Sequence, residues 1–170
     1  LRDAGDWVHH TQDAVNLIAR IHRRVVDAET GQRGFLLTQD ETYLIPYNEA
    51  VAEVPKDLEA LARLTDDNPV QIAQFATVRK LIDARFAQMR RSVQLKRNND
   101  DDAIRQYMAS PEGMVTMTSL RLALDGMAAE EQTQNQRRGV ALTDSQNQLR
   151  RGFYVLAGLN LLLLTLGGLF

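Results

Sequence analysis

The chain has 170 residues, no cysteine and a formal net charge of −2 at pH 7. This length suits one domain with an appendage, and a core of that size is stable without disulfides or bound metals. The lack of cysteine excludes disulfides and thiolate chemistry, and the charge provides no basic surface for nucleic acid. With four prolines and no strand-like alternation of any length, the sequence predicts an all-α protein.

The first predicted helix covers residues 3–37. Its inward-facing positions recur at alternating steps of four and three, the heptad spacing of a helix packed along its length against others. These positions are Trp7, Thr11, Ala14, Ile18, Ile21, Val25, Ala28, Gln32 and Phe35. Glu29 and Arg33 stand one turn apart in the favourable order, acid first. Gly31 and Gly34 weaken the helix, which indicates close approach of a neighbour or a bend.

The second predicted helix covers residues 39–64. Thr38 and Glu41 have the spacing of a capping box, so we expect this helix to begin just after Leu37. Pro55 lies inside it and is expected to kink or divide it. The predicted inward-facing positions are Tyr47, Val51, Val54, Leu58 and Leu61.

The third predicted helix covers residues 69–97. Asn68 is a suitable N-cap for it, and Pro69 suits the first helical position. The same four-three spacing predicts inward-facing positions at Ile72, Phe75, Arg79, Ile82, Phe86, Met89 and Val93, of which only Arg79 is polar.

The pattern breaks at residues 98–102, and a short amphipathic helix with Ile104, Tyr107 and Met108 is predicted to follow. Ser110 and Pro111 then have the residue types of an N-cap and a first turn. They begin a fourth long helix, with inward-facing Met117, Leu120, Leu124 and Met127. From residue 130 to 148 the apolar pattern fades, so we interpret this part as a stalk that pairs with its copy in a homodimer.

Residues 153–170 contain no charged side chain. As a helix they span about 27 Å, close to the ~30 Å of a bilayer core. We therefore predict that residues 151–170 form a second transmembrane helix, truncated here. Residues 1–150 are predicted to form an elongated up-down four-helix bundle whose long first and last helices reach toward the membrane. Arg150 and Arg151 favour the opposite orientation by the positive-inside rule.

No residue is predicted to be catalytic or to bind a cofactor or a metal. His9, His10 and His22 lack the i, i+4 spacing of paired metal ligands. Residues 98–102 lack the alternating ligands, the glycine and the closing glutamate of a calcium loop. Motifs for a nucleophile or a phosphate loop are missing from the sequence. We interpret Glu29 and Arg33 as a partly buried ion pair that fixes helix packing, in preference to a direct ligand contact.

One stretch resembles the signature of the third class of CHASE domains, the cyclase- and histidine-kinase-associated sensory extracellular domains of bacterial receptors. The stretch is residues 27–38, DAETGQRGFLLT, followed by Tyr43-Leu44 and Pro46-Tyr47. The motif positions with an expected structural or signalling role are Asp27, Glu29, Thr30, Gly31, Arg33, Gly34, Phe35, Tyr43, Pro46 and Tyr47. The sequence departs from the family pattern at Gln39, where the family often has glycine.

The resemblance implies a signal-input domain in the bacterial inner membrane, with residues 1–150 on the extracytoplasmic side. Its output module, most often a histidine kinase, is expected after residue 170, and its signal is an unidentified small molecule or protein. Two alternatives stay open. The first is the ligand-binding domain of a diguanylate cyclase or a chemoreceptor, and the second is a purely structural membrane-anchored bundle.

Overall fold

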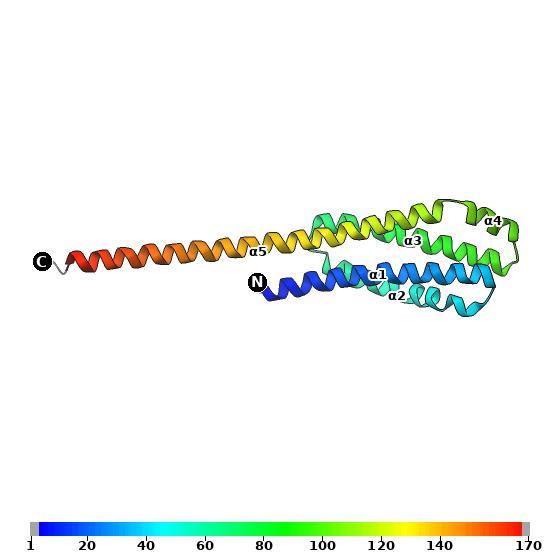
Figure 1. Cartoon of the computed structure of the whole chain (residues 1–170), viewed down its shortest axis with the longest axis horizontal. Coiled ribbons are helices and arrows are strands. Elements are labelled where there is room, and N and C mark those ends of the chain that lie inside the picture. Colours follow the sequence, from blue (N-terminus) through cyan, green and yellow to red (C-terminus); the bar gives the residue numbers. More distant parts are fainter. Residues whose placement is uncertain (1–3, 168–170) are drawn as a thin grey trace.

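The computed structural model describes the backbone of residues 4–167 and the side chains of residues 9–137 and 139–140. The elements are α1 (Ala4–Thr38), the short 3-10 helix η1 (Glu41–Leu44), α2 (Ile45–Leu64), α3 (Pro69–Arg97), α4 (Asp101–Ala109) and α5 (Glu112–Gly167). Figure 1 shows α1, α2, α3 and the first part of α5 running alternately up and down in an elongated bundle. The predicted all-α bundle with long first and last helices is confirmed.

The core of the bundle is built on the heptad seam of α1. All eight predicted positions from Thr11 to Phe35 are buried: Thr11, Ala14, Ile18, Ile21, Val25, Ala28, Gln32 and Phe35. Trp7, the first predicted position, lies outside the described side chains. Leu17 and Leu36 are also buried and widen the stripe. The register predicted for this helix is therefore correct.

The prediction for α2 is correct at four of its five inward positions. Tyr47, Val54, Leu58 and Leu61 are buried, whereas Val51 is 38% exposed and Ala50 takes its place in the core. Because α2 is one continuous helix with Pro55 inside it, the proline does not divide it. Asp57, also buried, accepts from Arg20 Nη2 at 2.8 Å and so ties α2 to α1.

The prediction for α3 is wrong at Ile72 and Arg79, whereas Phe75 is partly buried against the core, as predicted. Ile72 is 51% exposed and Arg79 is exposed, whereas Gln71, Val78, Arg85 and Ser92 are buried beside Ile82, Phe86, Met89 and Val93. Polar side chains occupy this buried line because other helices supply their hydrogen-bond partners. Gln71 Nε2 donates to the carbonyl oxygen of Met127 at 2.9 Å, and Ser92 Oγ accepts from Gln32 Nε2 at 2.7 Å.

The turn between α1 and α2 differs from the predicted capping box. α1 ends at Thr38, whose hydroxyl donates to the carbonyl oxygen of Gly34 at 2.8 Å. Gln39 then adopts a left-handed conformation with φ 59°. Asp40 is the N-cap of η1 and accepts from the Thr42 amide at 2.9 Å, so Glu41 is left to pair with Arg97. An Asx cap close to the turn competes successfully with the capping box.

The remaining boundaries agree with the sequence. Asn68 accepts from the Val70 amide at 2.9 Å and caps α3, as predicted. α4 is the predicted short helix; it contains no buried residue and so lies on the periphery of the bundle. Ser110 Oγ accepts from the Glu112 amide at 3.3 Å where α5 begins. In α5, Leu120, Leu124 and Met127 are buried and Met117 is half-buried.

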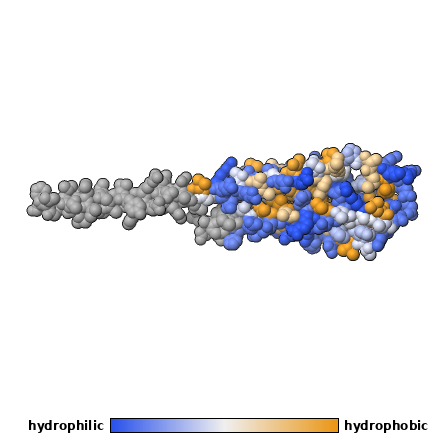
Figure 2. All heavy atoms as spheres, in the orientation of Figure 1, coloured by the Kyte–Doolittle hydropathy of each residue, from blue (hydrophilic) through white to orange (hydrophobic). Residues whose placement is uncertain are grey.

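α5 is a single helix of 56 residues that continues well past the N-terminal end of α1 (Figure 1). The predicted membrane segment, residues 151–170, lies outside the residues whose side chains are described. Among the described residues, no helix has both the length and the hydropathy needed to cross a bilayer. On the face seen in Figure 2, apolar residues are interspersed with hydrophilic ones along the bundle and do not form one continuous apolar surface.

Candidate functional site

The two glycines of the family motif allow η1 to pack directly on α1. A Cβ atom at Gly31 would overlap the backbone carbonyl oxygen of Tyr43, and one at Gly34 would overlap the Tyr43 ring. No larger residue fits at Gly31 without movement of the turn, or at Gly34 without movement of the Tyr43 ring. The predicted close approach at these glycines is confirmed, and Tyr43, another motif residue, is the neighbour.

Two further motif residues anchor the same corner in the core. Phe35 is 2% exposed, and the Arg97 guanidinium lies 5.8 Å from its ring centroid, within cation–π range. Tyr47 packs edge-to-face on Phe86 of α3, with ring centroids 6.5 Å apart. These contacts join the α1–α2 corner to α3, so this part of the motif has a packing role.

Three motif residues lie nearer the surface. Thr30 Oγ1 donates to the carbonyl oxygen of Val26 within α1 at 3.0 Å. Asp27 and Pro46 border a small pocket of about 250 Å³ together with Arg24 and Glu53. Asp27 and Thr30 are exposed, and neither is described as contacting the charged cluster of the motif.

That charged cluster is centred on Glu29. Glu29 Oε1 lies 2.6 Å from Arg33 Nη2 and 3.2 Å from Arg85 Nη2, so one carboxylate pairs with two guanidinium groups. The predicted Glu29–Arg33 pair is present and Glu29 is largely buried, at 12% side-chain exposure. Arg85 comes from α3 and is 3% exposed, so the pair is part of a triad that connects α1 to α3.

Arg85 also contacts groups that lead to α4 and α5. Its Nη1 donates to Gln88 Oε1 at 3.2 Å and lies 3.5 Å from the Tyr107 hydroxyl of α4. Gln88 Nε2 in turn donates to Thr116 Oγ1 of α5 at 3.1 Å. The cluster therefore links α1, α3, α4 and α5 through charged and polar groups alone.

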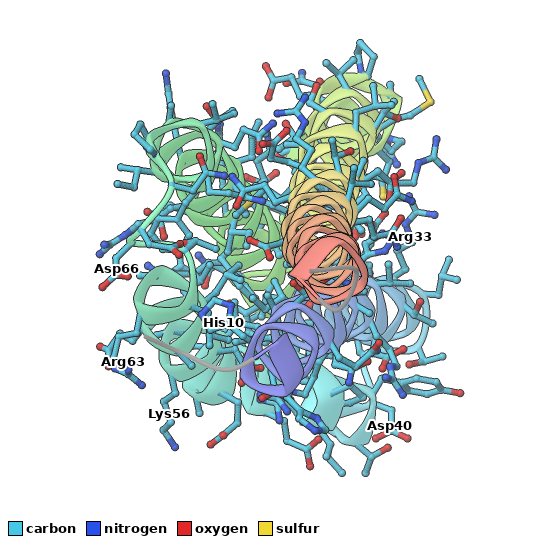
Figure 3. The ribbon with its side chains drawn as sticks, turned by 90° about the vertical axis from the view of Figure 1, so that its left-hand side faces the viewer. His10, Arg33, Asp40, Lys56, Arg63 and Asp66 are labelled. Atoms are coloured by element: carbon cyan, nitrogen blue, oxygen red, sulfur yellow. The ribbon has the colours of Figure 1, made fainter. Side chains whose placement is uncertain are left out.

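A pocket of about 340 Å³ opens beside this cluster, at the end of the bundle opposite the extension of α5. We call it the distal pocket. Arg33 and Gln32 of α1, Arg85 of α3, Tyr107 of α4, and Gly113 and Met114 of α5 all line it. In Figure 3, which views the bundle from the end of α5, Arg33 lies on the side away from Lys56 and Arg63 of α2.

Sequence reasoning identified Arg33 as a site residue but missed Arg85 and Tyr107. Arg85 lies directly before Phe86, in the part of α3 whose predicted inward positions are buried, but the predicted apolar stripe did not include this polar residue. A buried arginine is recognisable only by its partner, and Glu29 is far away in the sequence. Tyr107 was predicted solely as an apolar-face residue of the short helix.

An exposed ion pair between Glu41 of η1 and Arg97 of α3 joins these two elements at the surface. Arg97 Nη2 lies 2.7 Å from Glu41 Oε2, and the hydrogen bond from Arg97 lowers the pKa of Glu41 below 4.5. The same bond raises the pKa of Arg97. A hydrogen bond from Thr42 likewise lowers the pKa of Asp40, the N-cap of η1.

In the described part of the chain, no three His, Cys, Asp or Glu side chains converge in a way that could hold a metal ion. A third pocket, of about 210 Å³, lies between α2 and α3 and is lined mainly by apolar side chains such as Leu58, Phe75 and Ile82. None of the motif residues borders it. The distal pocket is thus the place where the charged cluster around Glu29 meets a cavity.

Comparison with known proteins agrees with this architecture. The family model of the CHASE3 domain matches residues 4–139, most of the chain. A similar solved structure is the sensor domain of the Rhodopseudomonas palustris histidine kinase HK9, with 32% sequence identity and a TM-score of 0.66. The alignment covers 72% of this chain and 95% of that one. No curated protein sequence matches closely enough to count as a relative.

The extent of the family match decides the identity, and the solved sensor domain supports it with the same fold. The chain acts in signal input rather than in the chemistry of an output module. It belongs to the CHASE3 family of receptor sensory domains.

Proposed function

We propose that this domain is the extracytoplasmic input domain of a sensor histidine kinase in the bacterial inner membrane. The observation that carries the proposal is the similarity to a histidine kinase sensor domain, at 32% identity over 95% of that domain. Under this proposal the kinase module follows residue 170 and residues 151–170 cross the membrane. Residues 1–150 then form the sensor outside, and two copies pair as a homodimer.

The geometry of α5 supports transmission along one helix. α5 begins at the distal pocket and continues without interruption for 56 residues, about 84 Å at 1.5 Å per residue. It packs on both α1 and α3 within the bundle. Because packed helix interfaces have discrete arrangements, a rearrangement at the head of the bundle can displace the far end of the same helix.

The test is the activity of the full-length receptor in membranes. We expect ATP-dependent phosphorylation on a histidine, which a substitution of that histidine abolishes. Deletion of residues 40–110 is expected to make this activity constant while the protein still inserts. Synthesis of a cyclic dinucleotide from GTP, or methylation of a long coiled coil without kinase activity, would contradict the histidine-kinase proposal. Stimulus-dependent activity that survives the deletion would favour a purely structural bundle.

A further inference from the structure

The distal pocket has a positively charged wall. Arg33 and Arg85 both line it, and no acidic side chain is among its described lining residues. The carboxylate that pairs with them, Glu29, contacts both guanidinium groups at 2.6 and 3.2 Å but does not line the pocket. One negative charge thus compensates two positive charges, so the wall keeps a net positive charge.

The buried arginine retains unused hydrogen-bonding capacity. Arg85 is 3% exposed, and its Nε atom has no hydrogen-bond partner among the described residues. Arginine has five N–H donors, and a buried donor without a partner is costly and rare in native proteins. Arg85, which lines the distal pocket, therefore has one buried donor that the described residues leave unsatisfied.

The start of α5 reinforces the preference for an anion. A Cβ atom at Gly113 would lie 3.0 Å from Arg85 Nη1, so the guanidinium packs closely on the first turn of α5. The N-terminus of a helix carries partial positive charge and favours anions, so a neighbouring cation is unfavourable there. An anion in the distal pocket, which Arg85 and Gly113 both line, would lie near both the guanidinium and this turn and would interact favourably with them.

The other walls indicate an organic ligand. Met108, Pro111 and Met114 supply apolar surface, and the volume of about 340 Å³ is at the lower end of the usual range for small-molecule sites. Arg33 is 60% exposed and Met114 is 65% exposed, so the pocket is accessible from solvent.

From these observations we propose that the distal pocket binds a small organic anion, whose carboxylate or equivalent group is held by Arg33 and Arg85. The assignment builds on the proposed input function by naming the class of ligand. A bound anion would contact α1, α3 and the first turn of α5 at once. Binding would therefore act directly on the helix that leads to the output module.

The proposal is tested by isothermal titration calorimetry on the full chain, residues 1–170, in detergent micelles. The probes are butyrate, succinate and inorganic phosphate, with butyramide as the uncharged counterpart of butyrate. We expect butyrate or succinate to bind and to raise the melting temperature, and butyramide to do neither. No heat from either carboxylate up to about 10 mM, or equal binding of butyramide, would overturn the proposal. Binding of phosphate alone would overturn the organic part of the assignment.

Variants locate the site. Arg33→Gln is expected to raise the Kd of the bound carboxylate about tenfold, the loss of one charge-assisted contact. Met114→Trp should fill the pocket and abolish binding. Arg85→Lys keeps a charge for Glu29 but loses the guanidinium fork, so it should weaken binding at least as much as Arg33→Gln. The first two side chains are exposed, so these variants are expected to fold.

Arg105→Gln is the matched control. Arg105 is an exposed arginine of α4 that pairs with Asp102 one turn away, and it does not line the pocket. Its variant should bind as the parent does. Equal weakening by Arg33→Gln and Arg105→Gln would mean non-specific electrostatics and would overturn the site. Because binding is measured on the chain itself, carboxylate binding without any kinase response would contradict the proposed function and leave the site standing.

Discussion

At the scale of single residues, most of the family motif either packs the α1–α2 corner or forms ion pairs beside it. Gly31 and Gly34 make room for Tyr43, while Phe35 and Tyr47 fix the corner to α3. Glu29 pairs with Arg33 and, less predictably, with Arg85. The motif positions thus divide into packing residues and a charged group beside the distal pocket.

Gly31→Ala and Gly34→Ala should have different costs although both add one methyl group to α1. At Gly31 the methyl group meets a backbone oxygen, so we expect a loss of stability of about 1–3 kcal/mol. At Gly34 it meets the ring of Tyr43, which is 46% exposed and can swing away, so the loss should be smaller. Thermal unfolding followed by circular dichroism measures both.

The control for the glycine pair is the Tyr43→Ala background. Without the ring, Gly34→Ala should become stabilising by up to about 1 kcal/mol through higher helix propensity. Gly31→Ala should remain destabilising there, because the carbonyl oxygen of residue 43 is still present. Equal effects of the two substitutions in both backgrounds would contradict the packing seen at this corner.

Gln39→Gly is expected to stabilise the domain. Gln39 has φ 59°, a left-handed conformation that costs a residue with a Cβ about 1 kcal/mol, and glycine adopts it freely. The substitution also removes the exposed hydrogen bond from Gln39 Nε2 to Asn99 Oδ1. Gln39→Ala is the matched control, because it loses that bond but keeps the strain. Chemical denaturation should rank glycine above the parent and alanine below; a glycine variant no more stable than alanine would refute the strain.

At the scale of elements, α3 is held on the α1–η1 corner by an ion pair outside the core. Arg97 at the end of α3 reaches Glu41 of η1, and its guanidinium also lies over the ring of Phe35. Gln32 and Ser92 make a buried hydrogen bond between α1 and α3 one level further in. Elements distant in sequence are thus connected at the head of the bundle by a few polar contacts.

Glu41→Gln should remove a pH-dependent part of the stability. The pKa of Glu41 is lower in the folded chain than its ordinary value of 4.5. Its stabilising effect is therefore present above pH 4.5 and is lost as the pH falls through the lowered pKa. Melting temperatures should differ between parent and variant at pH 7 and converge in acid. A difference that stays constant down to pH 2 would show that the ion pair contributes nothing; added salt should shrink the difference at pH 7.

At the scale of the whole molecule, the distal pocket and the region where output is expected lie at opposite ends of one helix. α5 is packed on α1 and α3 in the bundle and then continues alone (Figure 1). Its helical phase at the end of the bundle should therefore determine how everything after it is oriented. This property makes the stalk testable by insertion.

One residue inserted near Val140 rotates the following helix by about 100° and shifts it by about 1.5 Å, whereas seven residues nearly restore the phase. We expect insertions of one to three residues to lock or abolish output of the full-length receptor. A seven-residue insertion should largely preserve regulation. Phosphorylation in membranes is the readout for each insertion. Equal activity across the series would show that the stalk is a flexible tether.

Much of this architecture is determined by the sequence alone. Heptad spacing identified the register of α1 because its buried positions are nearly all apolar, and Asn68 marked the start of α3 through a local hydrogen bond. The close approach at Gly31 and Gly34 was also predictable. Glycine destabilises a helix, so its presence there indicates that a larger side chain would not fit.

Only the tertiary structure decided which polar side chains of α3 are buried, the form of the α1–α2 turn and the addition of Arg85 to the predicted pair of Glu29 and Arg33. Gln71, Arg85 and Ser92 are buried because their partners lie on other helices; Gln32 and Ser92, for example, are 60 residues apart. Periodicity detects apolar burial, which each residue favours by itself. Burial of a polar side chain is favourable only once a distant partner is in place, so the sequence indicates it only where apolar neighbours already fix the helix face, as at Gln32.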